Sequence, residues 1–211
     1  MGLLRAFADA VVVGAGTVRA EGGRALWTPD YIFPPGTKAF AVLRKALGRQ
    51  ETPRLVVITA RGELDPSERA LQVGALVLTT ARSAERLRKV LPKACEVRAI
   101  SDGDRIEVEE IFDVLQADGY HTILTEGGPE LFGELVANDR VDELFLTISP
   151  VLAGQKSDES FGLIRGVDFG RVPRRSRLLS VRRHESHLFL RYRLRESDFP
   201  PPLAGESRVG A

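Results

Sequence analysis

Short apolar runs separated by glycines and polar residues are the main pattern of the first part of the chain. The runs at residues 10–13, 55–59 and 76–80 are nearly continuous and rich in β-branched side chains. Such runs are typical of strands buried on both faces, as in a parallel sheet. We therefore predict strands at residues 10–13, 55–59, 76–80, 96–100 and 122–125.

Helical spacing and helix-end signals fall between these runs, whereas residues 22–36 are rich in glycine and proline and predict a packed loop. We expect Thr37, Asp65 and Ser83 to cap helices, with Glu68 completing a capping box. The expected helices are a short one at 17–21, one at 37–47, one that starts at 65–68, one from 83 to 90, one through 108–115 and one at 129–138.

The pattern changes after residue 140. An extended stretch at 141–150 is followed, at 177–195, by two runs that alternate apolar and polar residues around a turn near Glu185. One apolar and one polar face is typical of antiparallel strands. The sequence therefore predicts one α/β domain over residues 1–195, with a mainly parallel sheet, antiparallel C-terminal strands and a disordered tail at 196–211.

Composition narrows the functional classes. The chain has 211 residues and a net charge of +1, which does not favour nucleic acid as a partner. The single cysteine excludes an internal disulfide, and no apolar run approaches the roughly 20 residues of a membrane span, so we expect a cytoplasmic protein. The three histidines lack metal-ligand spacing, and neither a nucleophile elbow nor a Walker A loop is present, so we expect no metal site.

Two glycine-rich turns carry the candidate chemistry. Gly14, Gly16 and Thr17 follow the first predicted strand, and Glu126, Gly127, Gly128 and Pro129 follow the fifth. Each turn leaves backbone N–H groups free at a helix start, where a phosphate can approach. Either turn alone is equally consistent with a tight turn that binds nothing, but two at strand carboxyl ends favour a nucleotide. The arginines at 19, 24, 61 and 82 could pair with phosphate or be solvated.

The segments around these turns resemble a known family. Residues 8–21, 126–131, 141–144 and 148–154 are similar, in order and spacing, to the signatures of the riboflavin-biosynthesis reductase domain. This is the C-terminal domain of the bifunctional bacterial deaminase/reductase, and the resemblance covers roughly residues 3–195. It implies a dihydrofolate-reductase-like three-layer sandwich, a homodimer, and an oxidoreductase that transfers hydride from NADPH to a ribosylaminopyrimidine, the ring opening to a ribityl chain.

The resemblance also implies roles for individual residues. Those expected at the cofactor are Gly14, Gly16, Thr17, Thr59, Ala60, Arg61, Gly127, Gly128, Pro129, Leu131 and Phe132. Those expected at the substrate are Glu21, Arg24 and Glu126, with Glu126 as the catalytic candidate. Glu21 stands where the family usually has aspartate, and Thr59-Ala60 where members often carry Asp-Ser, so Arg61 is the expected partner of a 2′-phosphate.

One departure from the family concerns its opening strand, which carries a Ser-x-Asp-Gly motif and lines the active site. This sequence begins inside the helix that follows, at residues 3–9, so we expect two strand edges to lack a partner. A shortened start, a substitute segment or a degenerate relative would each explain it. The alternatives to the reductase are a dihydrofolate reductase, a non-catalytic NADPH-binding protein, and a structural dimer that uses residues 144–152 and 188–194.

Overall fold

The computed structural model describes residues 1–152, 162–170 and 174–195. The chain divides into two compact units, Met1–Phe132 and the residues from Gly133 onward, which are described separately here. The predicted tail at 196–211 lies outside the described residues, as do the last two residues of the 148–154 signature segment. A single domain over residues 1–195 stays a prediction.

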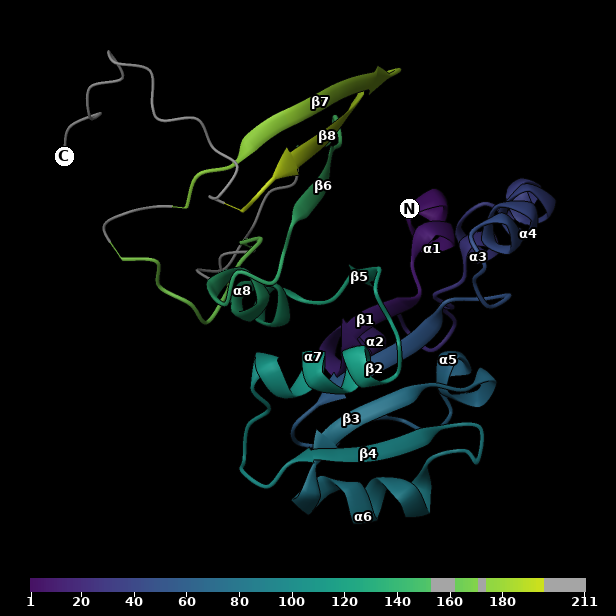
Figure 1. The fold of residues 1–211 in the computed structure, drawn as a ribbon, viewed down its shortest axis with the longest axis vertical. Coiled ribbons are helices and arrows are strands. Elements are labelled where there is room, and N and C mark those ends of the chain that lie inside the picture. The colour runs from purple at the N-terminus through teal and green to yellow at the C-terminus, as the bar shows by residue number, and fades with distance from the viewer. Residues whose placement is uncertain (153–161, 171–173, 196–211) are drawn as a thin grey trace. The chain divides into compact units, whose positions relative to one another are not determined.

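The first unit is built on a parallel sheet of five strands (Figure 1). The strands are β1 (Ala10–Gly14), β2 (Arg54–Thr59), β3 (Leu76–Thr80), β4 (Glu96–Ser101) and β5 (Ile123–Thr125). Their order across the sheet is β4-β3-β2-β1-β5, and all neighbours run parallel. All five predicted strands are thus confirmed, with small differences at their ends.

Alternate side chains of each strand enter two separate apolar layers. Val11, Val13 and Val57 pack on one face of the sheet, among side chains of the helices α2, α5 and α6. Val12 and Val56 pack on the other face, against α7. Because both faces are covered, the central strands need no polar side, which explains their continuous apolar runs. The three-layer arrangement predicted for the parallel sheet is confirmed in this unit.

The helices follow the predicted alternation with strands. They are α1 (Gly2–Phe7), α2 (Ala15–Ala20), α3 (Pro29–Ile32), α4 (Thr37–Ala46), α5 (Arg69–Val73), α6 (Ala81–Val90), α7 (Val108–Ala117) and α8 (Pro129–Ala137). The predicted loop at 22–36 is wrong in part, because it contains α3 and a 3-10 turn at Pro34–Gly36. Pro29 starts α3 at a position where a missing N–H costs nothing.

The three predicted helix caps are wrong, because each hydroxyl or carboxylate has a different partner. The Thr37 hydroxyl donates to the Pro34 carbonyl. Asp65 accepts the Ser67 backbone N–H in a local turn, so α5 begins only at Arg69. The Ser83 hydroxyl donates to the Ala60 carbonyl, 23 residues away, and α6 already begins at Ala81. Local hydrogen bonds of such side chains compete with capping.

The second unit contains an antiparallel sheet in the order β6-β8-β7. The strands are β6 (Glu143–Ile148), β7 (Arg177–His184) and β8 (His187–Arg193). The predicted turn is confirmed, since β7 and β8 meet at Glu185, which has a positive φ of 53°. The register places Leu146, Leu190 and Val181 side by side, so one face of the sheet is apolar.

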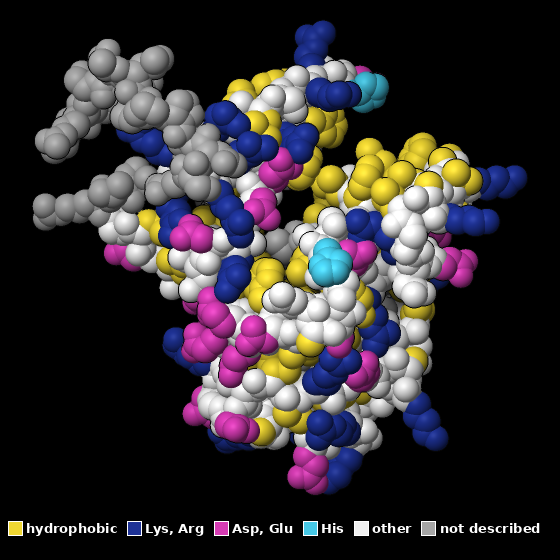
Figure 2. Space-filling view, viewed as in Figure 1, with side chains coloured by type: hydrophobic (Ala, Val, Ile, Leu, Met, Phe, Trp, Pro, Cys, Tyr) yellow, Lys and Arg dark blue, Asp and Glu magenta, His cyan; other side chains and the backbone are white. Residues whose placement is uncertain are grey.

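Each sheet has two edge strands among the described residues, β4 and β5 in the first unit and β6 and β7 in the second. β5 pairs with β1, and β6 pairs with β8, and neither has a partner on its other side in the described parts of the chain. The first unit also exposes apolar side chains on α1, α3 and α4, in the region where hydrophobic atoms gather in Figure 2. They include Leu3, Phe7, Tyr31, Ile32, Phe33 and Val42. Contiguous apolar surface of this kind is typical of interaction sites.

Candidate active site

The two glycine turns predicted from the sequence lie side by side. β1 and β5 are neighbours in the sheet and run parallel, so the turns that follow them leave the same edge. The backbone N–H of Glu126 donates to the Val12 carbonyl at 3.1 Å and extends the pairing past the end of β5. The sequence placed both turns at strand carboxyl ends, and the structure brings them together.

Gly127 is required by this close approach. A Cβ at position 127 would stand 2.6 Å from the Gly14 nitrogen and 2.7 Å from the Val13 Cα, both backbone atoms. Gly128 has a positive φ of 42°, and a Cβ there would lie 3.4 Å from the Thr17 hydroxyl. By contrast, a Cβ on Gly14 would meet nothing within 4 Å. The second turn is therefore packed against the first, whose own glycine faces open space.

Both glycine turns lead into helices, and the first-turn N–H groups of a helix have no partner within it. α2 begins at Ala15, with Gly14 as its N-cap and no capping side chain. α8 begins at Pro129, whose lack of an N–H costs nothing in a first turn. Because such N–H groups need acceptors, the two turns together can hold a phosphate group.

Glu126 lies beside the second turn and is held by an arginine. Arg5 Nε donates to Glu126 Oε1 and Arg5 Nη2 to Glu126 Oε2, each at 2.6 Å. The two side chains are nearly buried, with 6% and 11% of their surfaces exposed. This fork-to-fork geometry is the strongest arrangement of an arginine–carboxylate pair. The Glu126 carboxylate therefore has a fixed orientation in this unit.

Arg5 is a residue that the sequence analysis missed. Its third nitrogen, Nη1, donates to the carbonyls of Leu26 and Thr28 at 2.8 and 3.3 Å. It thereby joins α1, the segment around Trp27 and the second glycine turn. A single arginine within the apolar stretch of α1 is a visible signal, but its partner is 121 residues away in sequence. No local pattern identifies such a partner.

A third loop at the same sheet edge follows β2. The Thr59 hydroxyl accepts the Gly62 N–H at 3.0 Å, and hydroxyls of Thr80 and Ser83 donate to the Ala60 carbonyl at 3.0 and 2.9 Å. These contacts fix the loop backbone and leave Arg61 exposed, without a side-chain partner among the described residues. Arg82 lies nearby in sequence but pairs with Asp104 at 3.5 Å. Arg61 is therefore the better candidate of the two for a phosphate partner.

The remaining predicted site residues are more scattered. Glu21 is the C-cap of α2, and both Glu21 and Arg24 are exposed, so the structure does not join them to Glu126. The Leu131 side chain is partly buried and packs against the apolar layer that contains Ile111. Phe132 is half-buried, and its N–H donates to the Gly128 carbonyl.

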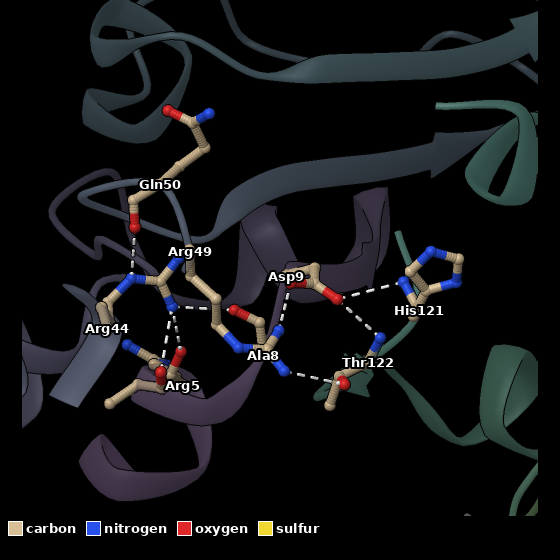
Figure 3. A network of polar contacts seen from close by, with 9 residues as sticks. Arg5, Ala8, Asp9, Arg44, Arg49, Gln50, His121 and Thr122 are labelled. Carbon is tan, nitrogen blue, oxygen red and sulfur yellow. Dashed lines mark hydrogen bonds and ion pairs between the residues drawn. The ribbon is translucent and has the colours of Figure 1, made fainter. Parts of the chain in front are cut away.

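The opposite end of the same two strands carries a different polar network (Figure 3). The Asp9 carboxylate accepts the backbone N–H groups of His121 and Thr122 and pairs with Arg49. Burial alone would raise the pKa of Asp9, but these hydrogen bonds and the Arg49 charge outweigh it, so the pKa lies below its usual value. Every Asp9 contact serves the fold.

Arg44 belongs to this network and is 1% exposed. Its guanidinium donates to the carbonyls of Arg5, Ala6 and Ala8 at the end of α1, and to that of Gln50. Arginine at a helix C-terminus satisfies carbonyls that have no partner within the helix. Arg44 therefore fixes the short helix α1, which carries Arg5.

No group of three or more histidine, cysteine, aspartate or glutamate side chains in the described parts of the chain could hold a metal ion. No helix among the described residues is long and apolar enough to cross a membrane.

The sequence matches the model of the RibD C-terminal domain over residues 1–186. The chain belongs to this family. A curated relative is the 2,5-diamino-6-ribosylamino-4(3H)-pyrimidinone 5′-phosphate reductase of Archaeoglobus fulgidus, 28% identical over 153 residues. That match covers 72% of this chain and 66% of the relative, just under two thirds of its length.

Solved structures agree with this assignment. A pyrimidine reductase-like protein from Corynebacterium diphtheriae has a TM-score of 0.65 and 26% identity, covering 92% of this chain and 78% of that one. The diaminohydroxyphosphoribosylaminopyrimidine deaminase/5-amino-6-(5-phosphoribosylamino)uracil reductase of Thermotoga maritima has a TM-score of 0.63. At 23% identity, covering 92% of this chain and 47% of that one, the Thermotoga match supports the fold. The predicted fold class and family are thereby confirmed.

Proposed function

We propose that this chain is an NADPH-dependent pyrimidine reductase of riboflavin biosynthesis. The observation that carries the proposal is the convergence of two glycine turns and one fixed carboxylate at the carboxyl edge of β1 and β5. Ligands of open α/β sheets bind at this edge. The Archaeoglobus relative, named as a reductase of a ribosylaminopyrimidinone phosphate, supports the class of substrate.

The residues present fit a dinucleotide. The first turn is open, since a Cβ on Gly14 would meet nothing within 4 Å, and Gly128 and Thr17 lie together beside it. The backbone of both turns, with Thr17, would hold the phosphates, and Pro129, Leu131 and Phe132 shape the helix start. Thr59, Ala60 and Arg61 would hold the adenosine end, with Arg61 on the 2′-phosphate. When bound, NADPH would supply the hydride.

We expect Glu126, Glu21 and Arg24 at the substrate. Each Glu126 oxygen accepts one bond from Arg5, and a carboxylate oxygen has a second lone pair. Glu126 would use the second positions to orient the pyrimidine or its ribosyl amine. Glu21 and Arg24, at the exposed end of α2, would bind more distant groups of the substrate.

The test is NADPH oxidation by the purified chain with the aminopyrimidine ribosyl phosphate, with dihydrofolate as the competing substrate. We expect oxidation with the aminopyrimidine and little with dihydrofolate. Faster oxidation with dihydrofolate would instead identify a dihydrofolate reductase. NADPH binding without oxidation by either compound would identify a non-catalytic binding protein. In Glu126→Gln, turnover should fall while NADPH affinity stays within about threefold of the wild type, a difference below 1 kcal/mol.

We also propose that the chain forms a homodimer through the apolar face of its antiparallel sheet. Val181 and Leu178 on this face are 52% and 49% exposed. Leu190 lies at its centre, between Leu146 and Val181, whereas Thr147 points to the other face. Leu190→Glu should therefore give a monomer by light scattering, whereas the control Thr147→Glu should keep the mass of a dimer. Equal masses for the two variants would rule out this interface.

A further inference from the structure

Arg5 bonds two segments of the proposed site, the Glu126 carboxylate and the backbone of residues 26–28. Four N–H groups of the Arg5 guanidinium are used, two on the Glu126 carboxylate and two on the carbonyls of Leu26 and Thr28. An arginine has five such donors in a rigid fork, so this geometry leaves the side chain almost no freedom. The positions of Glu126 and of the Trp27 segment are therefore coupled through one group.

The backbone of each joined segment is held independently of that pair. The Glu126 N–H is bonded to Val12, and Arg44 holds the Arg5 carbonyl from α4. Trp27, the single tryptophan of the chain, is 5% exposed and packs in the apolar layer under the sheet. Arg5 thus aims a carboxylate that already sits on a rigid frame.

We propose that Arg5 is a positioning residue of the site: it fixes the Glu126 carboxylate against the second glycine turn and ties it to residues 26–28. A substrate that contacts Glu126 then changes the surroundings of Trp27 through Arg5. The proposal rests on the proposed reductase function for its kinetic part. Its binding part requires only that a ligand reaches Glu126.

The chain offers a matched control at the opposite end of β1. Arg49 pairs with Asp9 at similar burial, with side-chain exposures of 14% and 21%, and has no contact with the glycine turns among the described residues. Arg5→Lys and Arg49→Lys each keep the positive charge but replace the planar guanidinium and its several donors by one ammonium group. A merely structural role of Arg5 predicts the same kinetic result for the two variants.

The kinetic experiment compares wild type, Arg5→Lys and Arg49→Lys as full chains. For Arg5→Lys we expect kcat to fall about 10- to 100-fold, because small displacements of a reacting constellation are this costly, while KM for NADPH changes less than threefold. For Arg49→Lys we expect kcat within about twofold of wild type. A kcat of Arg5→Lys equal to that of the control would overturn the proposal.

A second variant covers the case in which Arg5→Lys does not fold. Glu126→Asp keeps the charge but withdraws the carboxylate by one methylene from the fixed guanidinium of Arg5. We expect its kcat to fall at least about tenfold, since the orientation of the group and not its charge is what Arg5 supplies. Wild-type turnover by Glu126→Asp would contradict the positioning role.

The binding experiment separates this proposal from the proposed function. If the wild type oxidises no NADPH with the aminopyrimidine phosphate, the reductase assignment fails. The coupling between Glu126 and Trp27 is then tested by titration of the same compound, followed by Trp27 emission. We expect an emission shift in the wild type and in Arg49→Lys, and none in Arg5→Lys. A shift that survives in Arg5→Lys, or none in the wild type, would overturn the coupling.

Discussion

Two arginine–carboxylate pairs, both at least partly buried, lie at opposite ends of the neighbouring strands β1 and β5, and they differ in the acceptor positions that they leave free. Asp9 accepts two backbone N–H groups in addition to Arg49, and its own N–H and carbonyl bond to the adjoining strand starts. Glu126 accepts only from Arg5 in the described contacts, although it is the less exposed of the two carboxylates. A carboxylate with spare acceptor positions beside open glycine turns is suited to a ligand, whereas one that mainly holds backbone N–H groups is suited to the fold.

The surroundings of the two pairs also differ in how much backbone they leave accessible. Arg44 adds four bonds to carbonyl groups around the Asp9 end, so its side chain fixes the backbone of that part of the molecule. At the Glu126 end, Gly14 and Gly16 leave backbone accessible, and the start of α2 has no capping side chain. Substitutions at the two ends should therefore separate losses of stability from losses of binding.

The largest effect is expected for Gly127→Ala. The added methyl would meet the backbone of Val13 and Gly14, and neither can move without shifting β1. We expect a loss of about 3 kcal/mol in the free energy of unfolding, as for severe overpacking, together with loss of NADPH binding. Urea unfolding and a binding titration measure the two quantities. Wild-type stability in this variant would mean that the two turns are not in contact.

An intermediate effect is expected for Asp9→Asn at the other end of the strands. Loss of the ion pair and of one acceptor should cost about 2 kcal/mol, with kcat unchanged. The folded-state pKa of Asp9 is below its ordinary value of about 3.9, so its contribution is present above that pH and is lost as pH falls through the folded-state pKa.

The pH dependence of that variant is a second observable. Stability of Asp9→Asn should vary less than that of the wild type below about pH 4, because the titrating group has been removed. Thermal unfolding across the acid range would measure this. A parallel loss of kcat in Asp9→Asn would show that the two ends of β1 are not functionally separate.

The smallest effect on stability is expected for Gly14→Ala. Its φ of −78° and ψ of 151° suit alanine, and the methyl would meet no atom within 4 Å, so stability should stay within about 0.5 kcal/mol of the wild type or rise. The same methyl would occupy the approach of the cofactor phosphates. We expect the Kd for NADPH to rise about tenfold, or 1.4 kcal/mol. Unchanged affinity would indicate a tight turn without a ligand.

Much of the fold could be predicted because its causes are local. The continuous apolar β-branched runs predicted β1, β2 and β3, since such runs are typical of strands buried on both faces of a sheet, and the shorter runs at 96–100 and 122–125 predicted β4 and β5. Alternation along 177–195 likewise predicted β7, β8 and their turn. The glycine turns were visible because glycine marks places where backbone or ligand must approach closely.

What failed or was missed depends on groups that are distant in sequence. Ser83 does not cap its helix, because α6 already begins at Ala81, and the Ser83 hydroxyl donates to the Ala60 carbonyl across the turn. The Leu131 side chain packs against the apolar layer that contains Ile111, while its expected role at the cofactor stays a prediction. The helix periodicity did not determine this contact, and only the packing of the layers did.

The sequence by itself determined the order of strands and helices, the two glycine turns and the family, because hydrophobic periodicity and turn chemistry act over a few residues. The tertiary structure decided that β1 and β5 are neighbours, that Gly127 lies against Gly14, and that Arg5 holds Glu126. Arg5 and Glu126 are 121 residues apart in sequence. Burial and the order of strands across the sheet bring them together, and no local pattern contains that information.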